Sequence, residues 1–318
     1  MQMKAMILAA GGGTRLRPLT TLRPKPLFPV YAVPLLDIAL NQLAKAGFRD
    51  IMVNSHHLSR QISDFLEGIA RPDLAIGHSH EPELLGTGGA IKKLERFWGN
   101  RPFIVVNGDI LHTVDLADAY RAHDENGSLA TLVLHDNPRF SRVEVDEEGA
   151  IVGIRHQRVR ETKSATSMLA FTGIHIISPR VLDEIPTGRC VDIIDVYLKL
   201  AARGMDIRGH RAVNHYWCDI GTPEDYHRVH RDIYHNRCRP AGITPGSPLA
   251  AGGSSIGAGG TLNGYVSLGR HARIGDNCSI TDSIIWDNVS IDDHLTLRNC
   301  IVGDGVHVKK SLYNEIII

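Results

Sequence analysis

Three consecutive glycines and two basic residues near the amino terminus have the types and spacing to bind phosphate groups. Gly11, Gly12 and Gly13 directly follow an apolar stretch, and Arg15 and Lys25 come soon after them. Glycines after a strand leave backbone N–H groups free to face phosphate oxygens, because no Cβ blocks the approach. The order matches neither the GxGxxG pattern nor the GxxxxGK[ST] P-loop. The predicted phosphate loop comprises Ala10, Gly11, Gly12, Gly13, Thr14 and Arg15.

The two cations indicate what kind of phosphate this loop would bind. Lys25 stands between Pro24 and Pro26, which stiffen the chain around its charge, and Arg15 lies just past the glycines. Two fixed positive charges beside a phosphate loop suit a triphosphate and the pyrophosphate that leaves it. The alternative is a solvated pair of surface cations.

Two aspartates stand where a divalent cation could be bound. Asp109 comes soon after the apolar residues 103–106, and so lies at the carboxyl edge of a predicted sheet, where open α/β sheets bind ligands. Asp219 follows the apolar and aromatic residues 216–218. Mg²⁺ that also holds phosphates needs only one or two carboxylates, because water and substrate complete its shell. Taken alone, each aspartate fits a turn or a helix cap as well.

The composition narrows the class of protein. The chain has 318 residues and 43% apolar content, enough for a substantial buried core and about two domains. Lys plus Arg and Asp plus Glu both number 35, so no broad basic field is available for nucleic acid or for a membrane. The five cysteines and seventeen histidines lack the spacing of a disulfide framework or a zinc site. We expect a cytoplasmic protein that acts on a small polar substrate.

The elements that must position these residues alternate between strands and helices over the first 237 residues. Short apolar runs at 5–10, 51–54, 103–107 and 129–134 predict strands. Amphipathic stretches at 34–46, 115–123 and 223–237 predict helices, the second capped by Asp115 and the third by Thr222 with a proline in its first turn. This alternation predicts an α/β fold with a mostly parallel, Rossmann-like sheet.

A different pattern follows residues 238–248, whose prolines and glycines predict a linker. Aliphatic residues then recur mostly every six positions. Such a hexapeptide period predicts a short left-handed parallel β-helix over residues 249–318, in which each aliphatic residue points inward. Because a short solenoid has an open end and an apolar flank, we expect this domain to make the protein a homo-oligomer. The predicted inward positions are Ile256, Leu262, Leu268, Ile274, Ile280, Ile285, Ile291, Leu297, Val302 and Val308.

Residues 10–20 and 24–30 together resemble the signature of the sugar-phosphate nucleotidyltransferases. The resemblance continues through residues 86–90, 107–110, 171–174 and 217–222, and covers roughly residues 3–237. It implies an enzyme that joins a nucleoside triphosphate to a sugar 1-phosphate and releases pyrophosphate. It also implies that Asp109 and Asp219 hold Mg²⁺, while Arg15 and Lys25 stabilise the pyrophosphate. Several members of the family also carry a hexapeptide tail.

The same resemblance implies where base and sugar would bind. The loop with Glu81, Gly86, Thr87 and Gly88 lines the nucleobase pocket in the family. A carboxylate at Glu81 could accept both donors of guanine but only one of uracil or thymine, which favours GTP, with mannose 1-phosphate as the associated sugar. The sugar-phosphate candidates are Asn107, Gly108, Glu161, Lys163, Thr172 and Gly173. The sugar side departs from the family, since residues 160–164 lack its Glu-Lys-Pro motif and Ser141-Arg142 replaces its Tyr-Gly pair.

The sequence leaves three other functions open. The first is a uridylyl- or thymidylyltransferase that acts on another sugar 1-phosphate, including one of the N-acetylmuramate type. The second is a non-catalytic sugar-nucleotide regulator, which would be expected to lack the basic or metal-binding residues that this chain retains. The third is an acyltransferase formed by the β-helix, an activity that other hexapeptide proteins carry with a catalytic histidine.

Overall fold

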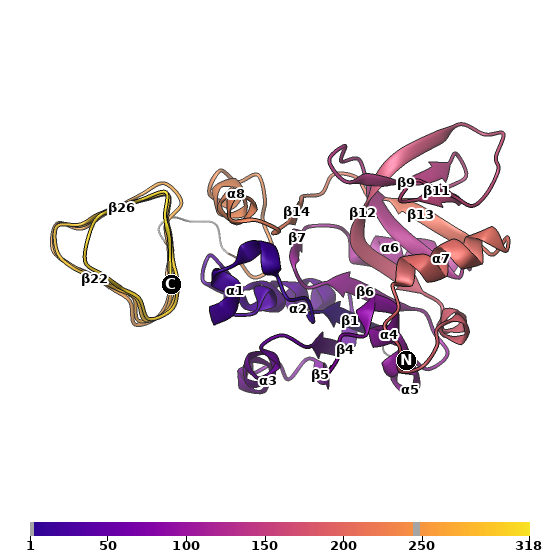
Figure 1. The fold of residues 1–318 in the computed structure, drawn as a ribbon, viewed down its shortest axis with the longest axis horizontal. Helices are drawn as coiled ribbons and strands as arrows, with labels where there is room; N and C mark the ends of the chain where they lie inside the picture. Colours follow the sequence, from indigo (N-terminus) through magenta and orange to yellow (C-terminus); the bar gives the residue numbers. More distant parts are fainter. Residues whose placement is uncertain (1–2, 244–248) are drawn as a thin grey trace. The chain divides into compact units, whose positions relative to one another are not determined.

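The sheet that carries the apolar runs lies in one of two compact units of the chain (Figure 1). The computed structural model describes residues 3–243 and 249–318. Unit 1 comprises Gln42–Gly108, Val114–Trp217 and the segment that ends at Gly11. Unit 2 comprises Gly12–Asn41, Asp109–Thr113 and Cys218–Ile318. The predicted β-helix therefore belongs to the same compact unit as the segment with Arg15 and Lys25.

The sheet of unit 1 has a parallel half and an antiparallel half. Its main path runs β11-β10-β9-β12-β6-β1-β4-β5, and β8 pairs with β12 and with β13. The pairs β6/β1, β1/β4 and β4/β5 are parallel, as predicted, whereas β12 runs antiparallel to β6, β8 and β9. The strands are β1 (Met3–Leu8), β4 (Phe48–Ser55), β5 (Ala75–His80), β6 (Phe103–Asn107), β8 (Ala130–His135), β9 (Ser141–Asp146), β10 (Ile151–Ile154), β11 (Gln157–Arg158), β12 (Thr166–Ile177) and β13 (Ile207–Arg211).

Helices form where the sequence supplies caps and an apolar face. Asp115 accepts a hydrogen bond from the backbone N–H of Asp118 and begins α6, and Asp192 caps α7 in the same way. An extensive apolar cluster of unit 1 includes Met6, Phe103 and Tyr197, from β1, β6 and α7. The helices are α2 (Leu35–Lys45), which crosses from unit 2 into unit 1, α3 (Ser59–Gly68), α4 (Gly86–Lys93), α5 (Glu95–Trp98), α6 (Leu116–Asn126), α7 (Ile193–Ala202) and the 3-10 helix η3 (Pro179–Glu184).

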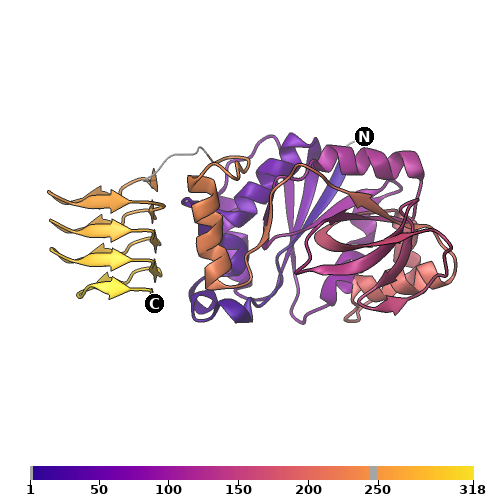
Figure 2. The same ribbon diagram turned by 90° about the horizontal axis from the view of Figure 1, so that it is seen from above.

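The carboxyl-terminal part of unit 2 is the predicted β-helix, whose stacked coils are drawn in yellow and orange in Figure 2. Over residues 249–318, short parallel strands form one five-stranded and two four-stranded sheets. Each predicted inward residue lies in one of these strands, and the buried ones form a continuous apolar cluster. Of the predicted linker 238–248, residues 244–248 lie outside the described residues. The strands are β15 (Leu249–Ala250), β16 (Ser255–Ile256), β17 (Thr261–Asn263), β18 (Ser267–Leu268), β19 (Arg273–Ile274), β20 (Ser279–Thr281), β21 (Ile284–Ile285), β22 (Ser290–Ile291), β23 (Thr296–Arg298), β24 (Ile301–Val302), β25 (His307–Val308), β26 (Leu312–Tyr313) and β27 (Ile316–Ile317).

Short elements complete unit 2 around the basic residues. Thr222 caps α8 through the N–H of Asp225, with Pro223 at the first position, as predicted. The strands β7 and β14 pair with each other. These elements are η1 (Thr14–Leu16), α1 (Leu19–Leu22), η2 (Lys25–Leu27), β2 (Pro29–Val30), β3 (Val33–Pro34), β7 (Ile110–His112), β14 (Trp217–Asp219) and α8 (Pro223–Tyr234).

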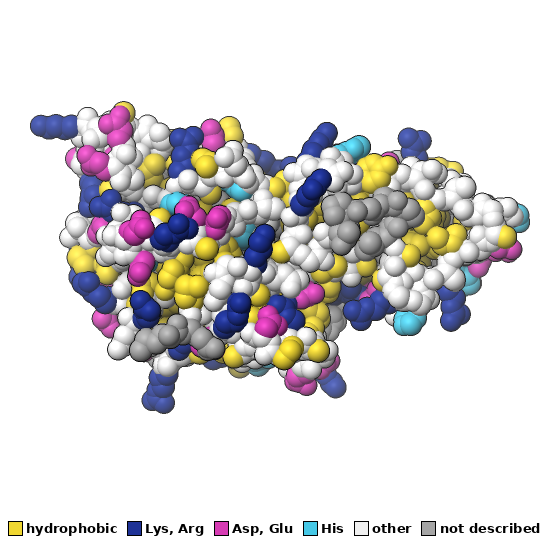
Figure 3. Space-filling model, turned by 180° about the vertical axis from the view of Figure 1, so that it is seen from behind, with side chains coloured by type: hydrophobic (Ala, Val, Ile, Leu, Met, Phe, Trp, Pro, Cys, Tyr) yellow, Lys and Arg dark blue, Asp and Glu magenta, His cyan; other side chains and the backbone are white. Residues whose placement is uncertain are grey.

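The surface shows no segregation of charge on the side drawn in Figure 3. Lys and Arg side chains are interspersed there with Asp and Glu side chains. In the described residues, no helix combines the length and the apolar character that crossing a bilayer would require.

Candidate active site

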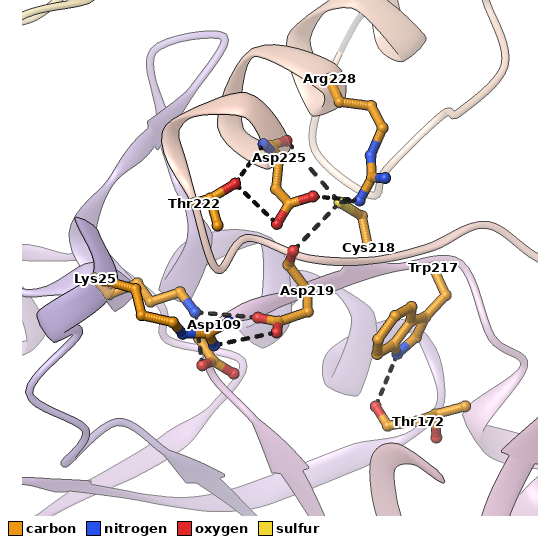
Figure 4. Close-up of polar contacts among 10 residues, drawn as sticks. Lys25, Asp109, Thr172, Trp217, Cys218, Asp219, Thr222, Asp225 and Arg228 are labelled. Carbon is orange, nitrogen blue, oxygen red and sulfur yellow. Dashed lines mark hydrogen bonds and ion pairs between the residues drawn. The ribbon is translucent and has the colours of Figure 1, made fainter. Parts of the chain in front are cut away.

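Four residues predicted from different sequence motifs meet in unit 2. The ammonium of Lys25 lies 2.8 Å from Oδ2 of Asp109 and 3.2 Å from Oδ1 of Asp219 (Figure 4). The guanidinium of Arg15 lies 3.4 Å from the other oxygen of Asp219. The Lys25 side chain is only 6% exposed, whereas that of Arg15 is 63% exposed. The cluster therefore has one fixed, buried cation and one cation that can reach a ligand from solvent.

Local backbone structure brings these side chains together. Lys25 begins η2 directly after Pro24, so its position is set by a stiff turn. Pairing of β7 with β14 continues in a hydrogen bond from the Ile220 N–H to the Asp109 carbonyl, 3.3 Å long, which brings the two aspartate motifs side by side. Sequence reasoning missed Gly221, where a Cβ would lie 2.7 Å from a guanidinium nitrogen of Arg15. A side chain at position 221 would therefore displace the guanidinium of Arg15 from its present place beside Asp219.

The glycine loop presents backbone to open space. A Cβ at Gly11 would meet no atom within 4 Å, and one at Gly12 would only touch the Thr14 methyl at 4.0 Å. Packing therefore does not explain either glycine, whereas close approach of a ligand to the backbone does. Thr14 and Arg15 are exposed and begin η1, and Ala10 is buried. This arrangement fits the predicted phosphate loop.

The carboxylates of Asp109 and Asp219 fit the donor set that Mg²⁺ prefers. Both reach the same ammonium, so the two carboxylates face one point that already holds a positive charge. Within the described residues, no group of three or more His, Cys, Asp or Glu side chains could hold a metal ion. Two carboxylates are sufficient for Mg²⁺ when phosphate oxygens and water supply the remaining ligands.

The structure does not support the predicted role of Glu81 in reading guanine. Glu81 is 1% exposed, and both of its oxygens are already hydrogen-bonded in unit 1. Asn54 Nδ2 donates to Oε1 at 2.7 Å, and the Leu85 N–H donates to Oε2 at 3.0 Å. Two of the roughly four lone-pair sites of this carboxylate are therefore taken by the protein, and burial of the side chain keeps the others away from solvent. Its role here is to hold the loop that precedes α4.

Gly86, Thr87 and Gly88 form the first turn of α4, and the protein itself requires the glycines. Gly86 has a φ of +64°, and a Cβ there would lie 2.6 Å from the Val191 carbonyl oxygen. The Gly88 N–H donates to that same oxygen at 2.8 Å. These glycines let the backbone at Val191 approach the start of α4, a reason for glycine that is independent of the predicted nucleobase pocket.

The predicted sugar-phosphate residues fall into three groups. Asn107 ends β6, and Gly108 follows it. Thr172 is wholly buried, and its hydroxyl donates to the Val133 carbonyl at 2.8 Å. This geometry gives no support to the predicted contact with the sugar phosphate, which stays a prediction. Gly173 is buried beside it, where the pairing of β12 with β8 is irregular. Glu161 and Lys163 are exposed between β11 and β12, and Glu161 lies 3.9 Å from Arg158.

Asn54 is a second residue that sequence reasoning missed. Its Oδ1 accepts a hydrogen bond from the Ala9 N–H at 2.7 Å, while its Nδ2 donates to Glu81. Asn54 therefore ties the start of the glycine loop to the loop before α4. The available signal was a polar residue at the carboxyl end of an apolar strand, the edge where ligands bind.

Family models match nearly the whole chain. The model described as nucleotidyl transferase matches residues 4–236. A second model, described as GlmU-like, C-terminal hexapeptide, matches residues 238–313. The second match agrees with a left-handed parallel β-helix built from hexapeptide repeats.

Curated relatives share about a third of their residues with this chain. A UTP–glucose-1-phosphate uridylyltransferase of Synechocystis is 33% identical, over 98% of this chain and 83% of its own length. A mannose-1-phosphate guanylyltransferase of Mycobacterium tuberculosis is 32% identical, over 92% of this chain and 82% of its own length. An N-acetylmuramate alpha-1-phosphate uridylyltransferase of Neisseria meningitidis is 35% identical, over 69% of this chain and 94% of its own length. With its glycine loop, its paired aspartates and its hexapeptide coils, this chain belongs to the nucleotidyl transferase family, in the branch that acts on sugar phosphates.

Proposed function

We propose that this protein transfers a nucleotidyl group from a nucleoside triphosphate to a sugar 1-phosphate. An oxygen of the sugar phosphate attacks the α-phosphorus, the bond between the α-phosphorus and the bridging oxygen breaks, and pyrophosphate leaves with that oxygen. The observation that carries the proposal is the cluster of Lys25 with Asp109 and Asp219 in the unit that also holds Gly12, Gly13 and Arg15. These groups place fixed charges where the triphosphate would bind and react.

The residues of the cluster have distinct roles in this proposal. Arg15 is exposed and binds the β- and γ-phosphates, and it neutralises charge on the departing pyrophosphate. Lys25 holds the two carboxylates in place and adds positive charge beside the phosphates. Asp109 and Asp219 would hold Mg²⁺, which when bound neutralises charge across the phosphate groups. Catalysis would come mainly from positioning and electrostatics, without a covalent enzyme intermediate.

GTP and mannose 1-phosphate are the substrate pair that we propose. The support is that relatives named mannose-1-phosphate guanylyltransferase align with 92–99% of this chain, and so with both its domains. Glu81 is buried and each of its oxygens already accepts a hydrogen bond from the protein, so it gives no support to a guanine preference. The alternative pair is UTP with another sugar 1-phosphate, which the two uridylyltransferase relatives favour. A cytoplasmic location is also part of the proposal, since all five cysteines are free thiols.

A screen of pyrophosphate release tests the function. Four nucleoside triphosphates are crossed with a panel of sugar 1-phosphates, with and without Mg²⁺. We expect the fastest release with GTP and mannose 1-phosphate and little release without the metal. If UTP is used faster than GTP with every sugar, the guanylyltransferase assignment is wrong and the uridylyltransferase replaces it.

The variant Asp109→Asn tests the site itself. It keeps the size of the side chain and removes one carboxylate, so turnover should fall by about a hundredfold or more, as when a single electrostatic group is removed from other active sites. A correctly folded Asp109→Asn protein with near-normal turnover would refute the role given to this carboxylate.

A further inference from the structure

Arg23, two residues before Lys25, is held by the β-helix within unit 2. Its Nε and Nη2 lie 3.1 Å and 2.6 Å from the two oxygens of Asp304, a bidentate pair. Nη2 also lies 3.1 Å from Oδ2 of Asp287. The Arg23 side chain is 16% exposed, so the three charges interact with limited screening by water.

The two aspartates are rigid partners because they also brace the coils. Oδ1 of Asp287 accepts a hydrogen bond from the Arg270 N–H at 2.7 Å. Oδ1 of Asp304 accepts one from the Asp287 N–H, one coil away, at 3.0 Å. Burial is the main reason why the pKa of Asp304 is raised, and the neighbouring Arg23 opposes that shift. The hydrogen bonds to the coils thus hold both carboxylates in place independently of the guanidinium.

An aromatic contact holds the chain on the other side of Lys25. The Phe28 N–H donates to the Lys25 carbonyl, and the Phe28 ring packs edge-on against Trp286 of the β-helix, with centroids 4.9 Å apart. Trp286 is wholly buried, and its Nε1 donates to the Tyr226 hydroxyl at 3.3 Å. The guanidinium of Arg23 lies over the same indole ring, 5.0 Å from its centroid. Residues 23–28 are thus attached to the β-helix at both ends.

We propose that Arg23 is a positioning residue, through which Asp287 and Asp304 of the β-helix fix Lys25 against Asp109 and Asp219. This inference rests on the proposed role of Lys25. Pro24 is the single residue between Arg23 and Lys25, and its fixed φ leaves little freedom to absorb a shift of Arg23. The β-helix is then part of the catalytic apparatus of its own chain, in addition to any role in self-association.

The test is a double-mutant cycle between Arg23 and Lys25 in the full-length protein. Arg23→Met keeps the length of the side chain and removes its charge. We expect kcat/KM for the triphosphate to fall by about ten- to a hundredfold, the scale of a misplacement of about 1 Å, with little change in KM for the sugar phosphate. In a Lys25→Ala background, Arg23→Met should cause less than about a twofold further loss, because the residue it positions is gone. Asp304→Asn, which is nearly isosteric, should produce a smaller loss of the same kind.

The matched control is Arg203→Met, which removes an arginine bonded at 2.7 Å to Glu184 in unit 1. It should leave both kinetic constants within about twofold of the wild type, as expected for a surface pair. The inference would be overturned if Arg23→Met caused equal losses in the wild-type and Lys25→Ala backgrounds. It would also be overturned if the two single variants Arg23→Met and Asp304→Asn both had normal kinetics. If Lys25→Ala is itself fully active, the proposed role of Lys25 fails first and the inference falls with it.

Discussion

Replacing Lys25 by Met should have opposite effects on the stability of the protein and on its response to Mg²⁺. The ammonium makes two charge-assisted hydrogen bonds, to Asp109 at 2.8 Å and to Asp219 at 3.2 Å, from a side chain that is almost fully buried. Methionine fills a similar volume without charge. The formal charges of Arg15, Lys25 and the two aspartates sum to zero, so the variant leaves the cluster with one net negative charge.

The magnitude follows from these contacts. A hydrogen bond to a charged group contributes about 1.5–3 kcal/mol. Asp109 is more than a third exposed, so water replaces part of what it loses, and the two bonds together should contribute about 2–4 kcal/mol. The remaining carboxylates also repel each other. For a protein of this size we expect the melting temperature to fall by roughly 3–6 °C.

The assay is thermal unfolding at several concentrations of Mg²⁺, with no substrate present. Because a ligand that binds only the folded state raises its stability, the variant should regain more stability with Mg²⁺ than the wild type does. Lys92→Met is the matched control, since Lys92 is also mostly buried and bonds to Glu95 and to the Leu182 carbonyl. It should be destabilised by a similar amount and show no added response to Mg²⁺.

Two results would contradict this reasoning. One is a Lys25→Met protein that melts at the wild-type temperature, which would mean that the ammonium contributes nothing to the cluster. The other is a destabilised variant that responds to Mg²⁺ no more than Lys92→Met does, which would mean that the two carboxylates do not bind the metal.

Three further predictions concern other parts of the molecule. Burial lowers the pKa of four histidines, so their side chains stay neutral in the folded state. The stability that this gives is fully present above pH 6.5 and should be lost as the pH falls toward 4, by up to about 2 kcal/mol per histidine at pH 5. Melting temperatures that do not change between pH 7 and pH 5 would contradict this. Ile256, 43% exposed on the first coil, should lie in the self-association surface, so Ile256→Glu should reduce the mass measured by light scattering, whereas the equally drastic Val213→Glu in unit 1 should not. Glu81→Gln should lower stability by about 1–3 kcal/mol, because one of its two donors loses a charged acceptor, yet leave the preference among triphosphates unchanged; a changed preference would restore its predicted contact with the base. The pKa values of the histidines are about 4 for His123 and His135 and about 3 for His175 and His230.

Features that depend on neighbouring residues were predictable from the sequence. The caps at Asp115 and Thr222 satisfy N–H groups three residues along the chain, so their signals are local. The hexapeptide period is similarly local, because each coil repeats the same short strand. The first strand ends at Leu8, two residues earlier than predicted, because the Ala9 N–H bonds to the side chain of Asn54 rather than to the backbone of a neighbouring strand.

Features that depend on distant residues were not predictable in the same way. Asn54, 27 residues earlier in the chain, donates a hydrogen bond to the Glu81 carboxylate, and no local sequence pattern predicts that contact. Thr172 was chosen for its motif, yet its burial follows from β8, which lies about 40 residues earlier. The antiparallel half of the sheet was missed because apolar runs indicate strands without indicating their partners. Arg15, Lys25, Asp109 and Asp219 were found because each lies in a motif of its own.

The assembly of unit 2 from three separate segments has a consequence for synthesis on the ribosome. The segment with Lys25 leaves the exit tunnel early, but Asp219 and then Asp287 and Asp304 are translated much later. At roughly 5–20 residues per second, the early segment waits on the order of ten seconds or more for its partners. During this interval Phe28 and Arg23 have neither the indole ring nor the carboxylates that they contact in the finished protein. Nascent chains stalled before and after the last coils should therefore differ sharply in protease resistance around residues 23–28, and slow codons near the carboxyl terminus should lengthen the exposure of this segment to chaperones and proteases.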